Sequence, residues 1–193
     1  HDNIGSQLTF IISSIDMARY TAQNGSKEQV TAKLQEIKEF SASTIDEFRD
    51  TIWALNKESI NLNDLELKLS SFISKAKSLV QHIHFTLLVS AKQQLALDSE
   101  TGIKLFRIIQ EAVNNAIKHS EAKEISISIF DESENIVIQI ADNGKGVVVA
   151  ELERTNGLNH METRAQEIGA GYDFTSHPGQ GTTIKISCQR SVI

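Results

Sequence analysis

The first 56 residues contain no proline, and their apolar side chains recur at intervals of three and four residues. This spacing is typical of amphipathic helices and restricts this part of the chain to long helical segments. One apolar stripe runs through residues 1–22 and a second through 27–56, with the break QNGSKEQ between them. Within the break, Ser26 and Gln29 predict a capping box for the second helix. We therefore predict a helical hairpin.

Each predicted helix carries more apolar surface than a lone hairpin covers. A symmetric pair of hairpins would bury both stripes in a four-helix bundle, so we expect a homodimer. The apolar positions are Ile4, Leu8, Ile11, Ile15 and Ala18 in the first helix and Val30, Leu34, Ile37, Ile45, Phe48, Ile52 and Leu55 in the second.

Composition narrows the class of protein. A net charge of −6 over 193 residues argues against a nucleic-acid partner, which requires a basic surface. A single cysteine, Cys188, excludes an internal disulfide, and no apolar run is long enough to span a membrane. We expect a cytoplasmic protein without membrane contact in this stretch. Because the chain begins at His1 without a methionine, we also expect it to be a piece of a longer protein.

The pattern changes after a polar segment at 57–63, which we interpret as a linker between a hairpin domain (1–56) and a second domain (64–193). Helices interspersed with strand hairpins predict an α/β sandwich, with helices on one face of a mixed sheet. The predicted helices are 64–80, 99–119 and 157–168, and the predicted strands are 82–89, 124–130, 135–141, 171–177 and 181–189.

Polar residues share one face of the predicted helix 99–119. Glu111, Asn115 and Lys118 lie at i, i+4 and i+7, with His119 beside them. A polar stripe next to a core stripe is usually a solvated surface. The same side chains could instead hold Mg²⁺ through their oxygens and meet a phosphate through the lysine.

Three glycine-containing motifs follow in order. Asp142 ends a strand and leads into Gly144 and Gly146, where a backbone without side chains permits close approach of a ligand. Gly157 precedes a helix whose N-terminus could face phosphates, and the stretch GQGTT at 179–183 enters the last strand. Taken singly, each motif is also an ordinary turn or helix start.

Taken together, the four motifs resemble the ATP-binding domain of the GHKL superfamily, which includes sensor histidine kinases and type II topoisomerases. The resemblance covers about 98–190 by motif and the rest of 64–193 by pattern. Glu111 to Asn115 match the N box of that family. The three glycine boxes are matched by Asp142, Gly144 and Gly146, by Gly157 and Leu158, and by Gly181 and Thr182.

The resemblance implies ATP and Mg²⁺ as ligands and gives a role to each matched residue. Asn115 would ligate Mg²⁺, with Glu111 holding a water or the second shell of the metal. Asp142 would accept a hydrogen bond from the adenine amino group, supported by Thr182. Residues of the same helix, Lys118 and His119, would contact the phosphates.

The segment 147–156 corresponds to the nucleotide lid in this comparison. It is short and lacks an internal phenylalanine. In this respect it is similar to kinases that pair with LuxR-type response regulators, so the resemblance implies such a receiver domain as partner.

The opening HDNIGSQL resembles the phosphoacceptor motif of the same kinase class. The resemblance implies that His1 takes the γ-phosphoryl group of ATP. The chemistry needs a neutral imidazole with a base at its other ring nitrogen, and Asp2 is the candidate base. The linker would let the ATP-binding domain swing to reach His1.

The opening departs from the family at one position. Many kinases of this class carry glutamine five residues after the histidine, where it is linked to dephosphorylating the partner regulator. Here Ser6 occupies that position and Gln7 follows. A shift of one residue rotates a side chain by about 100° around a helix, so the resemblance implies kinase activity without carrying over the phosphatase activity.

Two alternatives to a kinase stay open at this stage. One is a GHKL ATPase or ATP-gated interaction module in which Glu111 activates water. The other is a non-catalytic dimerisation module, which the intact Asn115, Asp142 and Gly144 disfavour.

Overall fold

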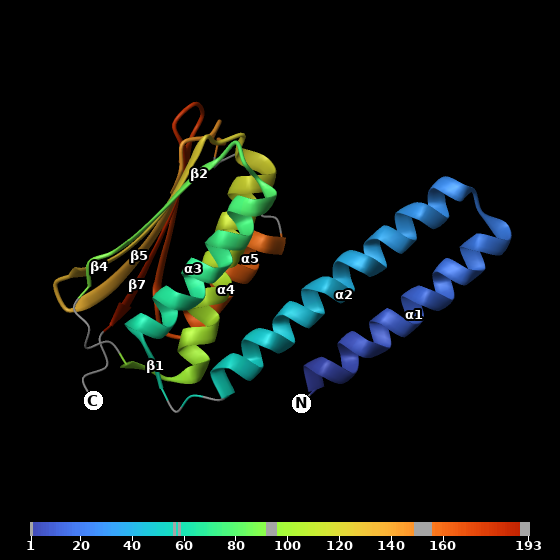
Figure 1. The fold of residues 1–193 in the computed structure, drawn as a ribbon, viewed down its shortest axis with the longest axis horizontal. Coiled ribbons are helices and arrows are strands. Elements are labelled where there is room, and N and C mark those ends of the chain that lie inside the picture. Colours follow the sequence, from blue (N-terminus) through green and yellow to red (C-terminus); the bar gives the residue numbers. More distant parts are fainter. Residues whose placement is uncertain (1, 56, 58, 92–95, 149–155, 190–193) are drawn as a thin grey trace. The chain divides into compact units, whose positions relative to one another are not determined.

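The computed structural model describes residues 2–55, 57, 59–91, 96–148 and 156–189. The chain divides into two compact units, His1–Asn56 and Lys57–Ile193 (Figure 1). Within the described residues, no helix is both long and apolar enough to cross a membrane.

The first unit is the predicted hairpin of two long helices, α1 (Asp2–Asn24) and α2 (Lys27–Leu55) (Figure 1). The predicted capping box is confirmed. The amide of Ser26 donates to Oε1 of Gln29 at 2.9 Å, and the amide of Gln29 donates to Oγ of Ser26 at 3.3 Å. Farther along the hairpin the rings of Phe10 and Phe40 lie 4.4 Å apart, centroid to centroid, so the two helices pack through aromatic side chains.

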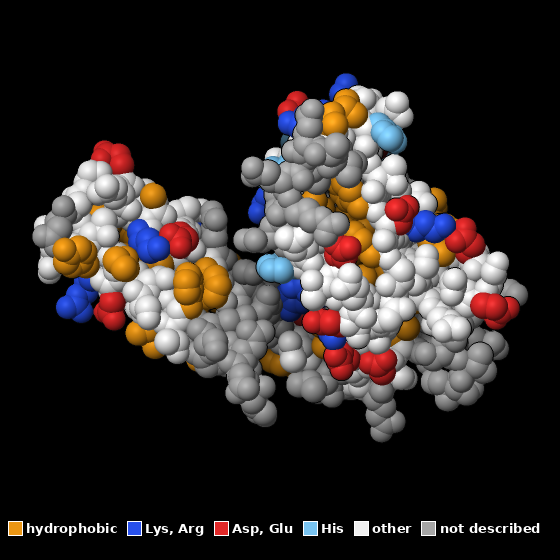
Figure 2. Space-filling view, turned by 180° about the vertical axis from the view of Figure 1, so that it is seen from behind, with side chains coloured by type: hydrophobic (Ala, Val, Ile, Leu, Met, Phe, Trp, Pro, Cys, Tyr) orange, Lys and Arg blue, Asp and Glu red, His pale blue; other side chains and the backbone are white. Residues whose placement is uncertain are grey.

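Large apolar side chains remain exposed on the hairpin, as Figure 2 shows. Among the hairpin side chains that the structure describes, few are buried within a single copy of the chain, for example Ser14, Ala18 and Thr44. The exposed apolar residues are Leu8, Phe10, Ile12, Ile15, Met17 and Tyr20 on α1 and Leu34, Ile45 and Ile52 on α2.

The second unit is the predicted α/β sandwich, built on a mixed five-stranded sheet with the order β2-β4-β5-β7-β6. The pair β2 and β4 is parallel, and the other neighbours are antiparallel. The strands are β2 (His84–Val89), β4 (Glu124–Glu132), β5 (Asn135–Asp142), β6 (Gly171–His177) and β7 (Gly181–Gln189).

Three helices cover one face of this sheet: α3 (Leu62–Leu79), α4 (Ser99–Asn115) and α5 (Asn156–Glu167) (Figure 1). On that face Ile129, Ile138 and Ile186 pair in register across three strands and are fully buried. The neighbouring row, Ser128, Gln139 and Lys185, points to the other face and is half-exposed. This alternation is what an antiparallel sheet with one solvated face requires.

The segment interpreted as a linker contributes to the core of the second unit. A short strand, β1 (Ile60–Asn61), pairs with β3 (Ala96–Leu97), and Ile60 and Leu62 are buried. Lys57 also contacts the second unit. Its ammonium pairs with Asp64, and its carbonyl oxygen accepts a hydrogen bond from Oγ of Ser99 at 2.7 Å. From Lys57 onward, the described residues of this segment are therefore ordered parts of the sandwich.

The helix that the sequence predicts over 99–119 changes form before its end. After Asn115 the chain continues as one turn of π-helix, η1 (Ala116–Ser120), and then reverses at Glu121 with φ 58°. A π turn closes i→i+5 hydrogen bonds and widens the helix. The positions of side chains after Asn115 therefore do not follow from α-helical spacing alone.

Candidate functional site

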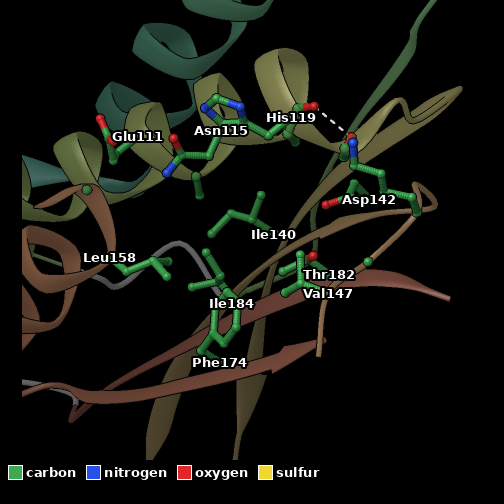
Figure 3. A pocket seen from close by; sticks show the side chains of 16 residues that line it. Glu111, Asn115, His119, Ile140, Asp142, Val147, Leu158, Phe174, Thr182 and Ile184 are labelled. Carbon is green, nitrogen blue, oxygen red and sulfur yellow. Dashed lines mark hydrogen bonds between the residues drawn. The ribbon is translucent and has the colours of Figure 1, made fainter. Parts of the chain in front are cut away.

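A cavity of about 440 Å³ opens between the α4–η1 helix and the sheet. Figure 3 shows Asp142 and Thr182 at one end, Glu111 and Leu158 toward the other, and Ile140, Ile184 and Phe174 between them. Its lining comes from segments that are far apart in sequence: Glu111, Ala112, Asn115, Ala116, His119, Ser120, Ile140, Asp142, Lys145, Gly146, Val147, Gly157, Leu158, Phe174, Thr182 and Ile184.

The end of β5 places a partly buried carboxylate in the cavity. Asp142 pairs in register with Thr182 of β7, and its Oδ1 accepts the amide hydrogen of Gly144 at 2.8 Å. Burial raises the pKa of Asp142, and the bond from Gly144 partly offsets this rise. A carboxylate held in this way accepts hydrogen bonds from a ligand, so this end of the cavity suits an amino group.

The middle of the cavity is apolar. Ile140 and Ile184 lie on neighbouring strands as a register pair, and Phe174 pairs with Ile184 from β6. Leu158 closes the wall from the first turn of α5. These surfaces match the apolar faces of a flat aromatic ring, whose polar edge would then meet Asp142.

The opposite end combines two oxygen-bearing side chains with a helix start. Glu111 and Asn115 lie one turn apart on α4 and both line the cavity. Gly157, in the first turn of α5, is so close to this pair that a Cβ there would collide with Oε1 of Glu111. The amide-rich N-terminus of a helix favours anions.

The donor set at this end fits Mg²⁺. In sites that bind nucleotides, Mg²⁺ uses one or two protein oxygens and takes the remaining ligands from phosphates and water. Asn115 and Glu111 supply such oxygens. Among the described residues no group of three or more His, Cys, Asp or Glu side chains forms a metal cage, so a metal here would depend on a ligand with its own oxygens.

Two predicted glycines are required by close backbone contacts rather than by the cavity surface. At Gly181, with φ 79°, an added Cβ would overlap the carbonyl oxygen of Asp142. At Gly146, with φ 59°, it would overlap the carbonyl oxygen of His177. Both positions combine a left-handed backbone with contact to a neighbouring main chain, which only glycine satisfies.

Most of the predicted site residues come together in this cavity. Those that line it are Glu111, Asn115, His119, Asp142, Gly146, Gly157, Leu158 and Thr182. Gly144 and Gly181 lie directly behind its wall, packed against Ser120 and Asp142. Lys118 is exposed on the π turn η1 and is not among the residues that line the cavity.

The predicted phosphoacceptor and lid largely lie outside the described residues. His1 is not described, and α1 begins at Asp2, whose side chain is not described either. Of the predicted lid at 147–156, residues 149–155 also lie outside the described part of the chain.

Several cavity residues were missed as site residues in the sequence, among them Lys145, Ser120 and Phe174. Lys145 lies between the two glycines of its motif, and its ammonium pairs with Glu121 at 2.8 Å. Its amide donates to the carbonyl of the buried Ser120 at 2.8 Å, which fixes the chain after β5 against η1. Phe174 reaches the cavity from β6. No local signal marks these residues, because the sheet pairing of β6 brings Phe174 to the site and the contact between η1 and the chain after β5 brings Ser120 and Lys145 there.

Comparison with known proteins identifies the class of this fold and site. Residues 100–191 match the family model for histidine kinase-, DNA gyrase B- and HSP90-like ATPases, and residues 1–60 match a histidine kinase model. The second unit is thus an ATP-binding domain of the GHKL type, which confirms the predicted superfamily. The chain belongs to the sensor histidine kinases of two-component systems.

Individual relatives agree with this assignment. Sensor protein VraS from Staphylococcus haemolyticus is 42% identical over 83 residues, which are 42% of this chain and 24% of the relative. The match to VraS from Staphylococcus aureus strain COL has the same identity and extent. The matched part of this chain thus corresponds to about a quarter of the length of these curated relatives.

A solved structure supports the fold independently of sequence identity. The Acinetobacter baumannii histidine kinase AdeS superposes with a TM-score of 0.63 over 98% of both chains at 14% identity.

Proposed function

We propose that this chain is the catalytic core of a sensor histidine kinase, which phosphorylates His1 with ATP and passes the phosphoryl group to an aspartate of a response regulator. The observation that carries the proposal is the cavity, which holds an amino-binding carboxylate at one end and Glu111 with Asn115 at the other, separated by an apolar floor. The match of residues 1–60 to a histidine kinase model supports His1 as the acceptor.

The nucleotide lies along this axis in our proposal. The adenine ring occupies the space between Ile140, Ile184 and Phe174, with its amino group on Asp142. Thr182 supports that contact through its hydroxyl. The phosphates extend toward Asn115 and the N-terminus of α5, which is favourable for anions.

Two further residues, which follow the N box, are proposed to contact the phosphates. Lys118 and His119 are exposed on η1, so both side chains can rearrange toward a bound triphosphate. Mg²⁺ would be held by Asn115, with Glu111 at its second shell, and would neutralise negative charge on the phosphates.

The phosphoryl transfer uses residues of the first helix. A neutral imidazole nitrogen of His1 attacks the γ-phosphorus, forming an N–P bond while the bond from that phosphorus to the β,γ-bridging oxygen breaks. ADP leaves with the electron pair of the broken bond. Asp2 accepts the proton at the other ring nitrogen, which prevents a cationic ring from expelling the phosphoryl group.

The proposed assembly is a homodimer with a receiver domain as partner. The apolar residues exposed on α1 and α2 support a four-helix bundle made by two hairpins. The match to the histidine kinase model at 1–60 and the short lid support a LuxR-type regulator. We place this core in the cytoplasm, attached through upstream segments to a sensor.

Labelling with γ-³²P-ATP and Mg²⁺ tests the proposal on the protein extended upstream of His1. The expected product is an acid-labile phosphoprotein that loses its label to a receiver domain. His1→Gln should abolish labelling while leaving ATP affinity unchanged, and Asn115→Ala should weaken both. Equal labelling of His1→Gln would overturn the assignment of His1, and steady ATP hydrolysis without any labelling would favour the GHKL ATPase instead.

A further inference from the structure

Ser176 is a buried hydroxyl directly behind the cavity wall. It lies on β6, is only 3% exposed, and pairs in register with Thr182 of β7. Its Oγ accepts the amide hydrogen of Val147 at 3.0 Å and donates to the carbonyl oxygen of Gly181 at 3.0 Å. A third contact joins it to Oγ1 of Thr182 at 2.9 Å.

The donor and acceptor count fixes the direction of that third contact. A hydroxyl has one hydrogen to donate and two lone pairs to accept with. The amide of Val147 can only donate and the carbonyl of Gly181 can only accept. The hydrogen of Ser176 is therefore committed to Gly181, and its remaining lone pair receives the hydrogen of Thr182.

This direction determines what Thr182 offers to a ligand. Since its hydrogen points at Ser176, Oγ1 of Thr182 presents lone pairs to the cavity that it lines. The carboxylate of Asp142, its partner across the strands, also accepts. Asp142 and Thr182 thus both present acceptors at this end of the cavity, which favours a base that carries an amino group over one that carries a carbonyl there.

We propose that Ser176 is a positioning residue for nucleotide selection: by holding the Thr182 hydroxyl as an acceptor, it favours a 6-aminopurine over a 6-oxopurine nucleotide. The proposal rests on the proposed function, because it specifies which base the ATP-binding cavity accepts. Ser176 does not line the cavity and acts only through Thr182 and the main chain.

The bond from Val147 predicts a second effect that can be separated from the first. Val147 lines the cavity, so loss of its partner loosens one wall for any nucleotide. That change lowers affinity for ATP and GTP together. The orientation of Thr182 affects only the ratio of the two affinities, and this ratio is therefore the specific readout.

Isothermal titration calorimetry of the full chain with Mg·ATP and Mg·GTP measures this ratio. The variants are Ser176→Ala, Thr182→Val and the double substitution, with Thr175→Ala as matched control. Thr175 is the preceding residue on β6, is exposed, and points to the other face of the sheet. Ser176→Cys keeps the volume of the side chain with a weaker donor, and it provides a second variant if the alanine form does not fold.

Ser176→Ala is expected to reduce the preference for ATP over GTP about three- to tenfold, the range of one hydrogen bond. Ser176→Cys should shift the ratio in the same direction, and Thr175→Ala should leave it unchanged. In the Thr182→Val background, removing the Ser176 hydroxyl should have no further effect on the ratio.

An unchanged ratio of ATP to GTP affinity in folded Ser176→Ala or Ser176→Cys would overturn the inference. So would a loss of ATP preference on removing the Ser176 hydroxyl that is as large in the Thr182→Val background as in wild type. A wild-type chain that binds ATP without preferring it to GTP also refutes it while leaving the kinase proposal intact. A wild-type chain that binds neither nucleotide refutes the proposed function itself.

Discussion

Asp142 shows how binding and stability oppose each other at a single residue of this site. Burial disfavours the charged carboxylate and raises its pKa, so holding it ionised in the folded chain costs free energy. A protonated carboxyl or an amide in the same place avoids that cost. The charge is nonetheless useful in the proposed complex, because an ionised acceptor forms a stronger hydrogen bond with an amino group than a neutral one does.

Asp142→Asn is therefore expected to weaken ATP binding about 10- to 100-fold, while stabilising the free protein at neutral pH. The folded pKa lies above the unfolded value of 3.8, so ionisation destabilises the wild type as pH rises through the folded pKa. The advantage of the variant should be largest above that pKa and should fade below pH 3.8. Urea unfolding of both proteins across this pH range measures the difference.

Asp173→Asn provides the control for this experiment, because Asp173 is an exposed carboxylate on β6. Asp173→Asn should bind ATP with the affinity of wild type, and its free energy of unfolding should equal that of wild type at each pH. An Asp142→Asn protein that is less stable than wild type at neutral pH would contradict the argument from burial.

At the scale of the elements, β1 and the start of α3 anchor the second unit at its N-terminal edge. Asn61 caps α3 by accepting from the amide of Asp64, whose carboxylate accepts in return from the amide of Asn61. Ile60 packs closely against Gly102 of α4: a Cβ added to Gly102 would lie 2.5 Å from Cδ1 of Ile60. A segment of largely polar composition is thus held in the second unit by buried apolar side chains, among them Ile60, and by the helix cap at Asn61.

Ile60→Ala should lower the free energy of unfolding by about 2–5 kcal/mol, because it leaves a cavity in the core at a position with no exposed surface. Leu67→Ala is the matched control on α3: Leu67 is 71% exposed, and its loss should cost less than about 0.5 kcal/mol. Urea denaturation followed by circular dichroism measures both. Equal small effects would mean that residues 57–63 behave as a free linker.

Elements with strong local signals were predictable from the sequence. The spacing of apolar residues and the residues of the turns predicted both long helices, the capping box at Ser26 and the order of the strand hairpins. The structure confirms all of these predictions. The pairing of β1 with β3 was not predictable, since two residues carry no periodicity and their register partners, Leu97 for Ile60 and Ala96 for Asn61, lie far along the chain. The π turn also escaped prediction, because helical spacing assumes one unchanging period.

The residues of the candidate site also fall into a group that was predictable from the sequence and a group that was not. The motif residues were visible in the sequence because glycines and acidic residues at strand ends stand out locally. Lys145, Ser120 and Phe174 were not, because sheet register and the η1 corner bring them to the cavity. Ser176 has an ordinary strand position, and only the geometry reveals its three contacts.

At the scale of the whole molecule, the first unit leaves much of its apolar surface exposed when it is taken as a single copy. Ile12 and Ile15 on α1 are 62% and 49% exposed, and Ile45 and Ile52 on α2 are 50% and 57% exposed. Several large apolar side chains left exposed on a helical hairpin indicate an interaction surface. A second copy of the hairpin offers the same surface, and symmetric pairing would bury both.

A substitution on this surface separates assembly from folding and from ATP binding. Ile12→Glu would place an unpaired carboxylate in each half of the interface, and burying such a charge costs several kcal/mol. We expect wild type to sediment as a dimer of twice 21.4 kDa and Ile12→Glu to sediment as a monomer that still binds ATP. Arg19→Glu is the control, since Arg19 is an exposed charged residue of the same helix and its position already accommodates a charge. It should leave the mass unchanged. A wild-type monomer, or an Ile12→Glu dimer, would show that another surface covers these residues.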